Sequence, residues 1–260
     1  IDFIQRTSEA AEIFYLLNRK KKPQQSVCTF RVQGRRPWLL DPVTGESRPL
    51  PDYELREGRT AVPLEVLARE AYFIVFPREE STRQDGGGNA AARRGNFPRF
   101  HPVLTLEGRW TVRFDPRWGG PESVEFDALT DWSKHPDPGI RYYSGTATYL
   151  KTFDAPAGLE REASLVLELG TVHCIADVRL NGQLLGTVWT SPWRIRLPRG
   201  LKPEGNVMEI AVTNTWPNRL IGDAALPSEK RLTNANIEFM PDAPLQPSGL
   251  LGPVTVLAET

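Results

Sequence analysis

The segment from Thr213 to Asp223, TNTWPNRLIGD, gathers side chains whose chemistry suits a sugar. Sugar rings stack their apolar C–H faces on indole rings, while their hydroxyls need amide, carboxylate or guanidinium partners. Pro217 prevents a regular strand ladder, so we expect the segment to leave the sheet as a loop. The candidates for carbohydrate binding, or for contact with another domain, are Trp189, Trp193, Asn214, Trp216, Asn218, Arg219 and Asp223.

The same segment also has a purely structural interpretation. Trp216 would close one end of a sandwich, and Arg219 would pair with Asp223 to fasten the loop. The two interpretations are compatible, because a rigid loop makes a better wall for a site. Core packing is favoured for three further tryptophans near turns rich in Pro and Gly, namely Trp110, Trp118 and Trp132.

Carboxyl pairs are the second source of chemistry. Hydrolysis of a glycosidic bond needs two carboxyls, roughly 5 Å apart for retention or roughly 6.5–9.5 Å apart for inversion. With 32 acidic residues, some pair will meet such a distance by chance, so turn capping and surface ion pairs are the favoured roles. The candidates are Asp115, Glu125, Asp131 and Asp223, and no residue is assigned as catalytic.

Motifs for metals, nucleophiles and phosphates are missing from the sequence. His101, His135 and His173 have no partner at a zinc spacing, and no G-x-S-x-G, Walker or dinucleotide motif occurs. A structural calcium held by loop carbonyls and carboxylates is compatible with a jelly roll, but no pattern locates it. No cofactor is therefore predicted for this chain. Cys28 and Cys174 lie in separate strand-like stretches, which favours two buried free thiols over a disulfide.

Net charge and the length of apolar runs limit the kinds of partner that the chain is expected to bind. Lys and Arg number 32 and so do Asp and Glu, so no net field favours nucleic acid. No run approaches the roughly 18 apolar residues of a membrane span, so no membrane partner is predicted. The sequence begins without Met or an apolar leader and within strand-like text. We therefore expect it to be part of a longer protein.

Hydrophobic alternation predicts an all-β chain. The 23 Pro and 21 Gly punctuate short apolar runs, as turn-rich β folds require. We predict a small antiparallel β-sandwich over residues 1–78, a linker or long loop over 79–100, and a jelly-roll, galactose-binding-like β-sandwich over 101–260. Within the last block, Asn181-Gly182 between alternating apolar residues predicts a tight hairpin, because both positions accept positive φ.

Ordered stretches of the sequence resemble a known family. In the second block these are YYSGTATYLKTF (142–153), ADVRLNG (176–182), PWR (192–194) and TNTWPNRLIGD (213–223). In the first block they include TFRV (29–32) and LDPVTG (40–45). Together they resemble the C-terminal β-sandwich region of glycoside hydrolase family 106, the α-L-rhamnosidase type, with a jelly roll like the sugar-binding domain of family 2.

This resemblance implies that the acid and base carboxylates, and a calcium ion, belong to a (β/α)₈-type barrel of the same polypeptide. The sequence has no strand–helix alternation over the roughly 250 residues that such a barrel needs. We therefore expect a non-catalytic accessory region that supports the barrel and contacts carbohydrate. The alternatives are a free-standing carbohydrate-binding module and a purely structural interaction domain. The resemblance suggests a bacterial protein exported to the periplasm or exterior.

Overall fold

The computed structural model describes residues 1–78, 95–159, 164–199, 201–237 and 239–260. Contacts divide the chain into two compact units, one of residues Ile1–Arg99 with Thr260 and one of residues Phe100–Glu259. Both units are built from antiparallel strands with few and short helices, which confirms the predicted all-β class.

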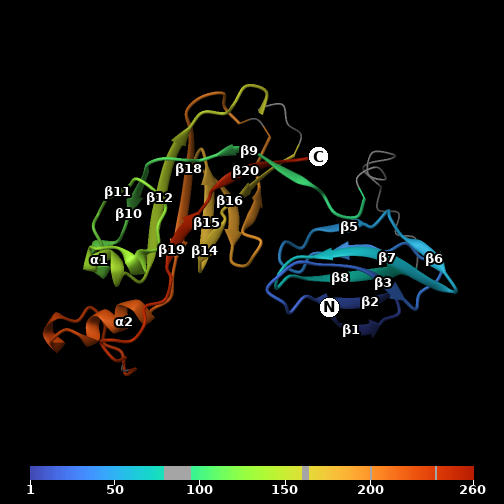
Figure 1. Cartoon of the computed structure of the whole chain (residues 1–260), viewed down its shortest axis with the longest axis horizontal. Helices are drawn as coiled ribbons and strands as arrows, with labels where there is room; N and C mark the ends of the chain where they lie inside the picture. Colours follow the sequence, from blue (N-terminus) through green and yellow to red (C-terminus); the bar gives the residue numbers. More distant parts are fainter. Residues whose placement is uncertain (79–94, 160–163, 200, 238) are drawn as a thin grey trace. The chain divides into compact units, whose positions relative to one another are not determined.

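The N-terminal unit is a small sandwich of two antiparallel sheets (Figure 1). Its core contains Phe14, Phe30 and Phe76, whose ring centroids lie 4.8–5.9 Å apart. These rings come from both sheets, so the inner faces pack together. The five-stranded sheet has the order β1 (Asp2–Thr7), β2 (Ala11–Leu17), β8 (Ala71–Pro77), β4 (Trp38–Leu40), β5 (Ser47–Pro49), and the three-stranded sheet the order β3 (Gln24–Phe30), β7 (Arg59–Val66), β6 (Glu54–Arg56).

The C-terminal unit is a larger sandwich. Its six-stranded sheet has the order β11 (Val124–Phe126), β10 (Trp110–Arg113), β12 (Thr146–Phe153), β18 (Asn206–Thr213), β15 (Ile175–Leu180), β16 (Gln183–Val188). Its four-stranded sheet has the order β17 (Arg194–Arg196), β13 (Leu165–Glu168), β20 (Thr255–Glu259), β9 (Phe100–Thr105), and β14 (Thr171–His173) pairs with β19 (Gly249–Gly252). Side chains from both larger sheets, such as Val178, Ile210, Leu167 and Val256, form one buried core.

The strands of this unit follow the alternation of the sequence. In β15, Ala176, Val178 and Leu180 are buried and the residues between them are exposed, because successive side chains of a strand point to opposite faces. Asn181 and Gly182 have φ of 52° and 83° and join β15 to β16. The predicted hairpin is therefore confirmed.

Two short helices lie at one end of the C-terminal unit (Figure 1): α1 (Pro138–Arg141) and α2 (Pro217–Ala224). One-turn 3₁₀ helices occur at Pro116–Trp118, Trp132–Lys134 and Ser228–Lys230. Helix α2 corrects the expectation of a loop over the TNTWPNRLIGD segment. Pro217 occupies the first helical position, where its missing N–H costs nothing and its fixed φ favours the helix.

The expected linker is only partly visible. Residues 79–94, including the three consecutive glycines, lie outside the described residues. Residues 95–99 belong to the N-terminal unit: Asn96 is buried, and its amide donates to the Asp52 and Pro63 carbonyls. The Phe97 ring packs against Tyr72. This part of the expected linker is therefore fastened to the first sandwich, because its amide and aromatic side chains find partners there.

Candidate functional site

Helix α2 and its neighbours bring together most of the residues singled out in the sequence. Trp216 precedes the helix and is 47% exposed. Its indole packs edge-on against Trp118, with ring centroids 5.0 Å apart and planes at 77°. Trp118 sits in a 3₁₀ turn that the Asp115 side chain caps. An exposed indole is thus held against a second, half-buried one.

Helix α2 contains a buried ion pair. Arg219 Nη2 and Asp223 Oδ1 are 3.0 Å apart, one turn of α2 from each other, and their side chains are only 7% and 4% exposed. Asp223 Oδ2 also accepts from the backbone N–H groups of Leu232 and Thr233 and from the Thr233 hydroxyl. The pairing expected from the sequence is confirmed, and it anchors the chain that follows α2.

Two amides, the buried Asn218 and the partly buried Asn214, fasten this region to neighbouring segments. Asn218 Nδ2 donates to the Gln246 carbonyl at 2.7 Å, and Asn218 Oδ1 accepts from the Gln246 N–H at 2.8 Å. Asn214 accepts from the Gly145 N–H and donates to the Tyr143 carbonyl. Both amides also donate to the Ser248 hydroxyl at 3.1 Å. These polar groups are used within the fold, so they position the surface instead of forming it.

The candidate carboxylates have structural partners. Asp131 caps a 3₁₀ turn and accepts from the Ser248 N–H at 3.0 Å, and Glu125 accepts from the Thr111 hydroxyl at 2.7 Å. Asp115 accepts from the side chain and backbone of Arg117, and these hydrogen bonds lower the pKa of its carboxyl. Each carboxylate therefore has a role in turns or sheets, as the sequence favoured.

The other tryptophans divide into core and surface. Trp110 and Trp132 are fully buried, and Trp132 Nε1 donates to the Tyr149 hydroxyl at 2.6 Å. Burial raises the pKa of Tyr149. Trp193 packs against the core of the C-terminal unit, whereas Trp189, after β16, is 57% exposed. Trp189 is thus the one residue of the predicted set, besides Trp216, whose indole is largely open to solvent.

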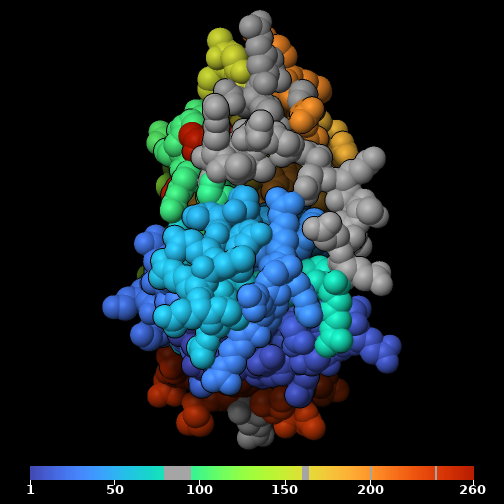
Figure 2. All heavy atoms as spheres, turned by 90° about the vertical axis from the view of Figure 1, so that its right-hand side faces the viewer, coloured from blue at the N-terminus to red at the C-terminus, as the bar shows by residue number. Residues whose placement is uncertain are grey.

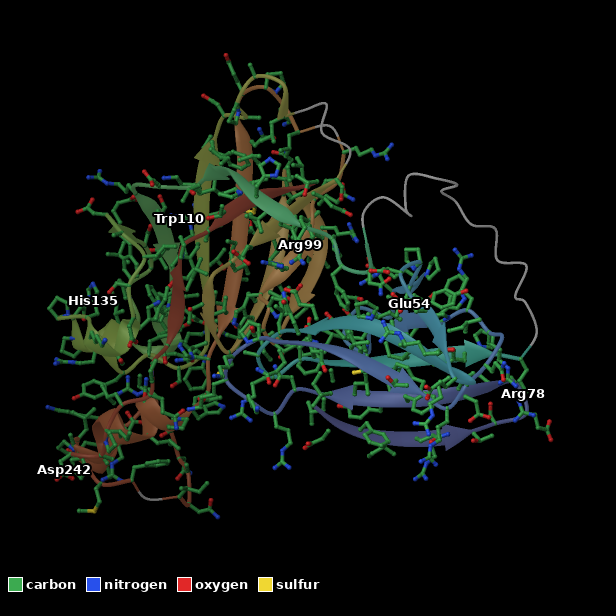
Figure 3. The ribbon with its side chains drawn as sticks, turned by 45° about the vertical axis from the view of Figure 1, so that its right-hand side comes forward. Glu54, Arg78, Arg99, Trp110, His135 and Asp242 are labelled. Carbon is green, nitrogen blue, oxygen red and sulfur yellow. The ribbon has the colours of Figure 1, made fainter. Side chains whose placement is uncertain are left out.

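A separate hollow of about 550 Å³ lies on the N-terminal unit, whose surface is blue to cyan in Figure 2. At its rim, Glu65 Oε2 accepts from Arg99 at 2.9 Å and from Gln25 at 3.3 Å. Arg99 is labelled in Figure 3. The other lining residues are Ser26, Val27, Asp52, Pro63, Leu64, Gly95, Asn96 and Phe97.

The described residues contain neither a metal-binding cluster nor a helix that could span a membrane. Nowhere in these ranges do three or more His, Cys, Asp or Glu side chains converge as a metal site would require. The part of the chain that the structure describes also lacks a helix of the length and apolarity needed to cross a bilayer. Cys28 and Cys174 are free and partly buried, and burial raises the pKa of the Cys28 thiol.

Sequence reasoning missed several residues at this site. Trp118 packs against the core, as expected, but its contact with Trp216 was not predicted, and Gln246 and Ser248 were not considered. Both latter residues lie about thirty positions beyond Asn218, so no local spacing connects them to α2. The only signal near them is the polar QPSG stretch before β19.

Known proteins resemble both units. A family model described as alpha-L-rhamnosidase matches residues 1–55, and one described as glycosyl hydrolase 2 galactose-binding domain-like matches residues 126–245. A Formosa agariphila protein named "Putative beta-glucuronidase" is 35% identical over 216 residues, which are 82% of this chain and 18% of that protein. The structure of a rhamnosidase from Novosphingobium sp. PP1Y matches with a TM-score of 0.84 and 37% identity over 98% of this chain and 23% of that one.

The paired sandwiches and these matches define a class: the chain is homologous to β-sandwich domains of bacterial glycoside hydrolases. Within that class it resembles the β-sandwich region of family 106, the α-L-rhamnosidase type, and its jelly roll resembles the galactose-binding-like domain of family 2. The chain spans less than a quarter of the length of either relative.

Proposed function

We propose that this chain is a non-catalytic accessory region of an α-L-rhamnosidase-like glycoside hydrolase, working beside a catalytic barrel of the same polypeptide. The observation that carries the proposal is the match of 98% of this chain to only 23% of a rhamnosidase. The roles of the candidate carboxylates agree with it, since Asp115, Asp131 and Asp223 all serve turns or a buried ion pair.

The surface that would support the barrel lies after α2. The chain from 225 to 248 contains the short 3₁₀ helix Ser228–Lys230 and is longer than the roughly 12–15 residues beyond which connections are uncommon and often functional. Asp223 holds the backbone of Leu232 and Thr233, and Asn218 holds that of Gln246. Three large apolar side chains of this stretch face solvent: Leu232 at 42%, Ile237 at 62% and Met240 at 69%. Asp242, labelled in Figure 3, marks this connection, which we call the α2–β19 connection.

An activity assay of this chain tests the proposal. If the acid and base belong to the barrel, the chain alone should not hydrolyse an aryl α-L-rhamnoside, whereas a complete family 106 enzyme in the same assay should. Reproducible turnover by the purified chain, abolished by one carboxylate substitution such as Asp131→Asn, would show that the region is itself catalytic and overturn the proposal.

A second candidate function is carbohydrate binding by the chain itself. The specific observation that favours it is the exposed indole of Trp216, held edge-on by Trp118. A purely structural interaction domain, the remaining alternative, would use the α2–β19 connection but would not need an exposed, braced indole beside polar groups.

A further inference from the structure

A small surface of mixed character lies at the start of α2. It consists of Thr215, Trp216 and Gln246, all three exposed to solvent, and we call it the Trp216 platform. The Thr215 hydroxyl and Gln246 Oε1 are 3.3 Å apart and share a hydrogen bond. An indole, a hydroxyl and a primary amide therefore lie within two neighbouring chain segments.

Two members of the platform, Trp216 and Gln246, are held by neighbouring parts of the fold. Asn218, only 1% exposed, bonds both the N–H and the carbonyl of Gln246, which fixes the backbone that presents the amide. The Trp118 ring braces the indole of Trp216. Such prior ordering reduces the entropy lost when a ligand binds.

The chemistry of the platform selects a neutral ligand. None of its three side chains carries a charge, and the buried charges of Arg219 and Asp223 on α2 are paired 3.0 Å apart. An exposed indole offers an apolar π-face, while the amide and hydroxyl can donate to and accept from adjacent hydroxyls. In the described ranges, no hydrogen bond involves Gln246 Nε2, so its two N–H groups are open to a ligand.

We propose that the Trp216 platform binds one neutral sugar ring, which stacks an apolar C–H face on Trp216 and hydrogen-bonds through ring hydroxyls to Gln246 and Thr215. This site gives the proposed accessory region its own contact with the glycan, and so rests on that function. Because the platform is open and binds a single ring, its affinity should be weak.

Calorimetric titration of the chain with methyl α-L-rhamnoside and with a neutral rhamnose-containing oligosaccharide tests this site. Trp216→Ala should weaken binding at least tenfold, because the stacking face is lost, and Trp216→Phe should retain part of the affinity. Gln246→Ala should weaken binding several-fold. Trp189→Ala is the matched control: it removes an even more exposed indole, 57% against 47%, and should leave affinity unchanged.

The titrations test the sugar site independently of the proposed accessory role. If no glycan gives heat with folded protein, or if Trp189→Ala abolishes binding and Trp216→Ala does not, the platform is not a sugar site. The accessory role would stand in either case, since it is decided by the turnover assay. Gln246→Ala tests the platform even if Trp216→Ala disturbs Trp118. The Gln246 side chain is exposed, and its removal leaves the hydrogen bonds between Asn218 and the Gln246 backbone in place.

Discussion

At the scale of single residues, the end of the C-terminal unit depends on polar groups that contact other parts of the protein. Asp223, Asn214 and Asn218 are residues in which the sequence suggested ligand chemistry, yet their hydrogen bonds go to the protein itself, and Arg219 is held by its ion pair with Asp223. A buried polar group without a partner costs far more than the net gain of a typical hydrogen bond. These side chains therefore make the exposed surface rigid.

Substitution of Arg219 by methionine should show how much this region depends on its ion pair. The change leaves the Asp223 carboxylate buried without its cation, and loss of one partner of a buried pair typically costs about 3–5 kcal/mol. We expect the midpoint of urea unfolding, followed by tryptophan fluorescence, to fall accordingly.

The matched control for this change is Arg117→Met. Arg117 also pairs with an aspartate, but its side chain is 86% exposed, and solvent-exposed pairs contribute little. The unfolding midpoint should hardly move. Equal losses for the two variants would mean that burial does not decide the strength of these pairs in this fold.

At the scale of elements, the sequence predicted those strands and turns that depend mainly on neighbouring residues. Buried and exposed residues alternate in β15, and Asn181-Gly182 located the β15–β16 hairpin. Strand β9 contains Pro102, which its position at a sheet edge tolerates. Helix α2 was missed because Pro217 excludes a strand and is equally compatible with a loop or with the first turn of a helix.

Two glycines with similar backbone conformations should respond very differently to alanine. Gly182 has φ of 83° and no atom near its missing Cβ, so Gly182→Ala meets only left-handed strain of about 1–2 kcal/mol. Gly170 has φ of 66°, and a Cβ there would collide with the Gly252 backbone, its bridge partner. Gly170→Ala should therefore cost clearly more, because β14 and β19 would have to separate.

Thermal unfolding of both glycine variants, monitored by circular dichroism, measures the difference. Gly182→Ala serves as the reference for pure backbone strain, since space around it is open. A Gly170→Ala variant as stable as Gly182→Ala would mean that the close approach of Gly170 and Gly252 is not required for the fold.

At the scale of the whole molecule, the fold class could be predicted and the site only in part. Core positions follow from hydrophobic alternation, which is local, whereas the Trp216 platform joins residues about thirty positions apart. The contact between Gln246 and Asn218 exists only after the α2–β19 connection folds back on the helix. The sequence therefore predicted Trp216 as a candidate, but neither its Trp118 brace nor its polar neighbours.

If the α2–β19 connection packs against the catalytic barrel, substitutions in it should affect stability differently in the isolated chain and in a complete enzyme that contains the chain. Ile237→Ser and Met240→Ser remove apolar side chains that are 62% and 69% exposed here. The isolated chain should keep its unfolding temperature, because surface changes typically alter stability by less than about 0.5 kcal/mol. In the complete enzyme, the same changes should lower the unfolding temperature, because burial of apolar area against the catalytic barrel would be lost at about 25 cal/mol per Å².

The control is Leu55→Ser on β6, which removes a side chain of similar exposure, 59%, from the other unit. It should leave the unfolding temperature of both proteins unchanged. Docking through the α2–β19 connection requires Ile237→Ser and Met240→Ser to destabilise only the complete enzyme. If they leave that enzyme as stable as Leu55→Ser does, the connection does not contact the barrel, and its exposed apolar residues need another explanation.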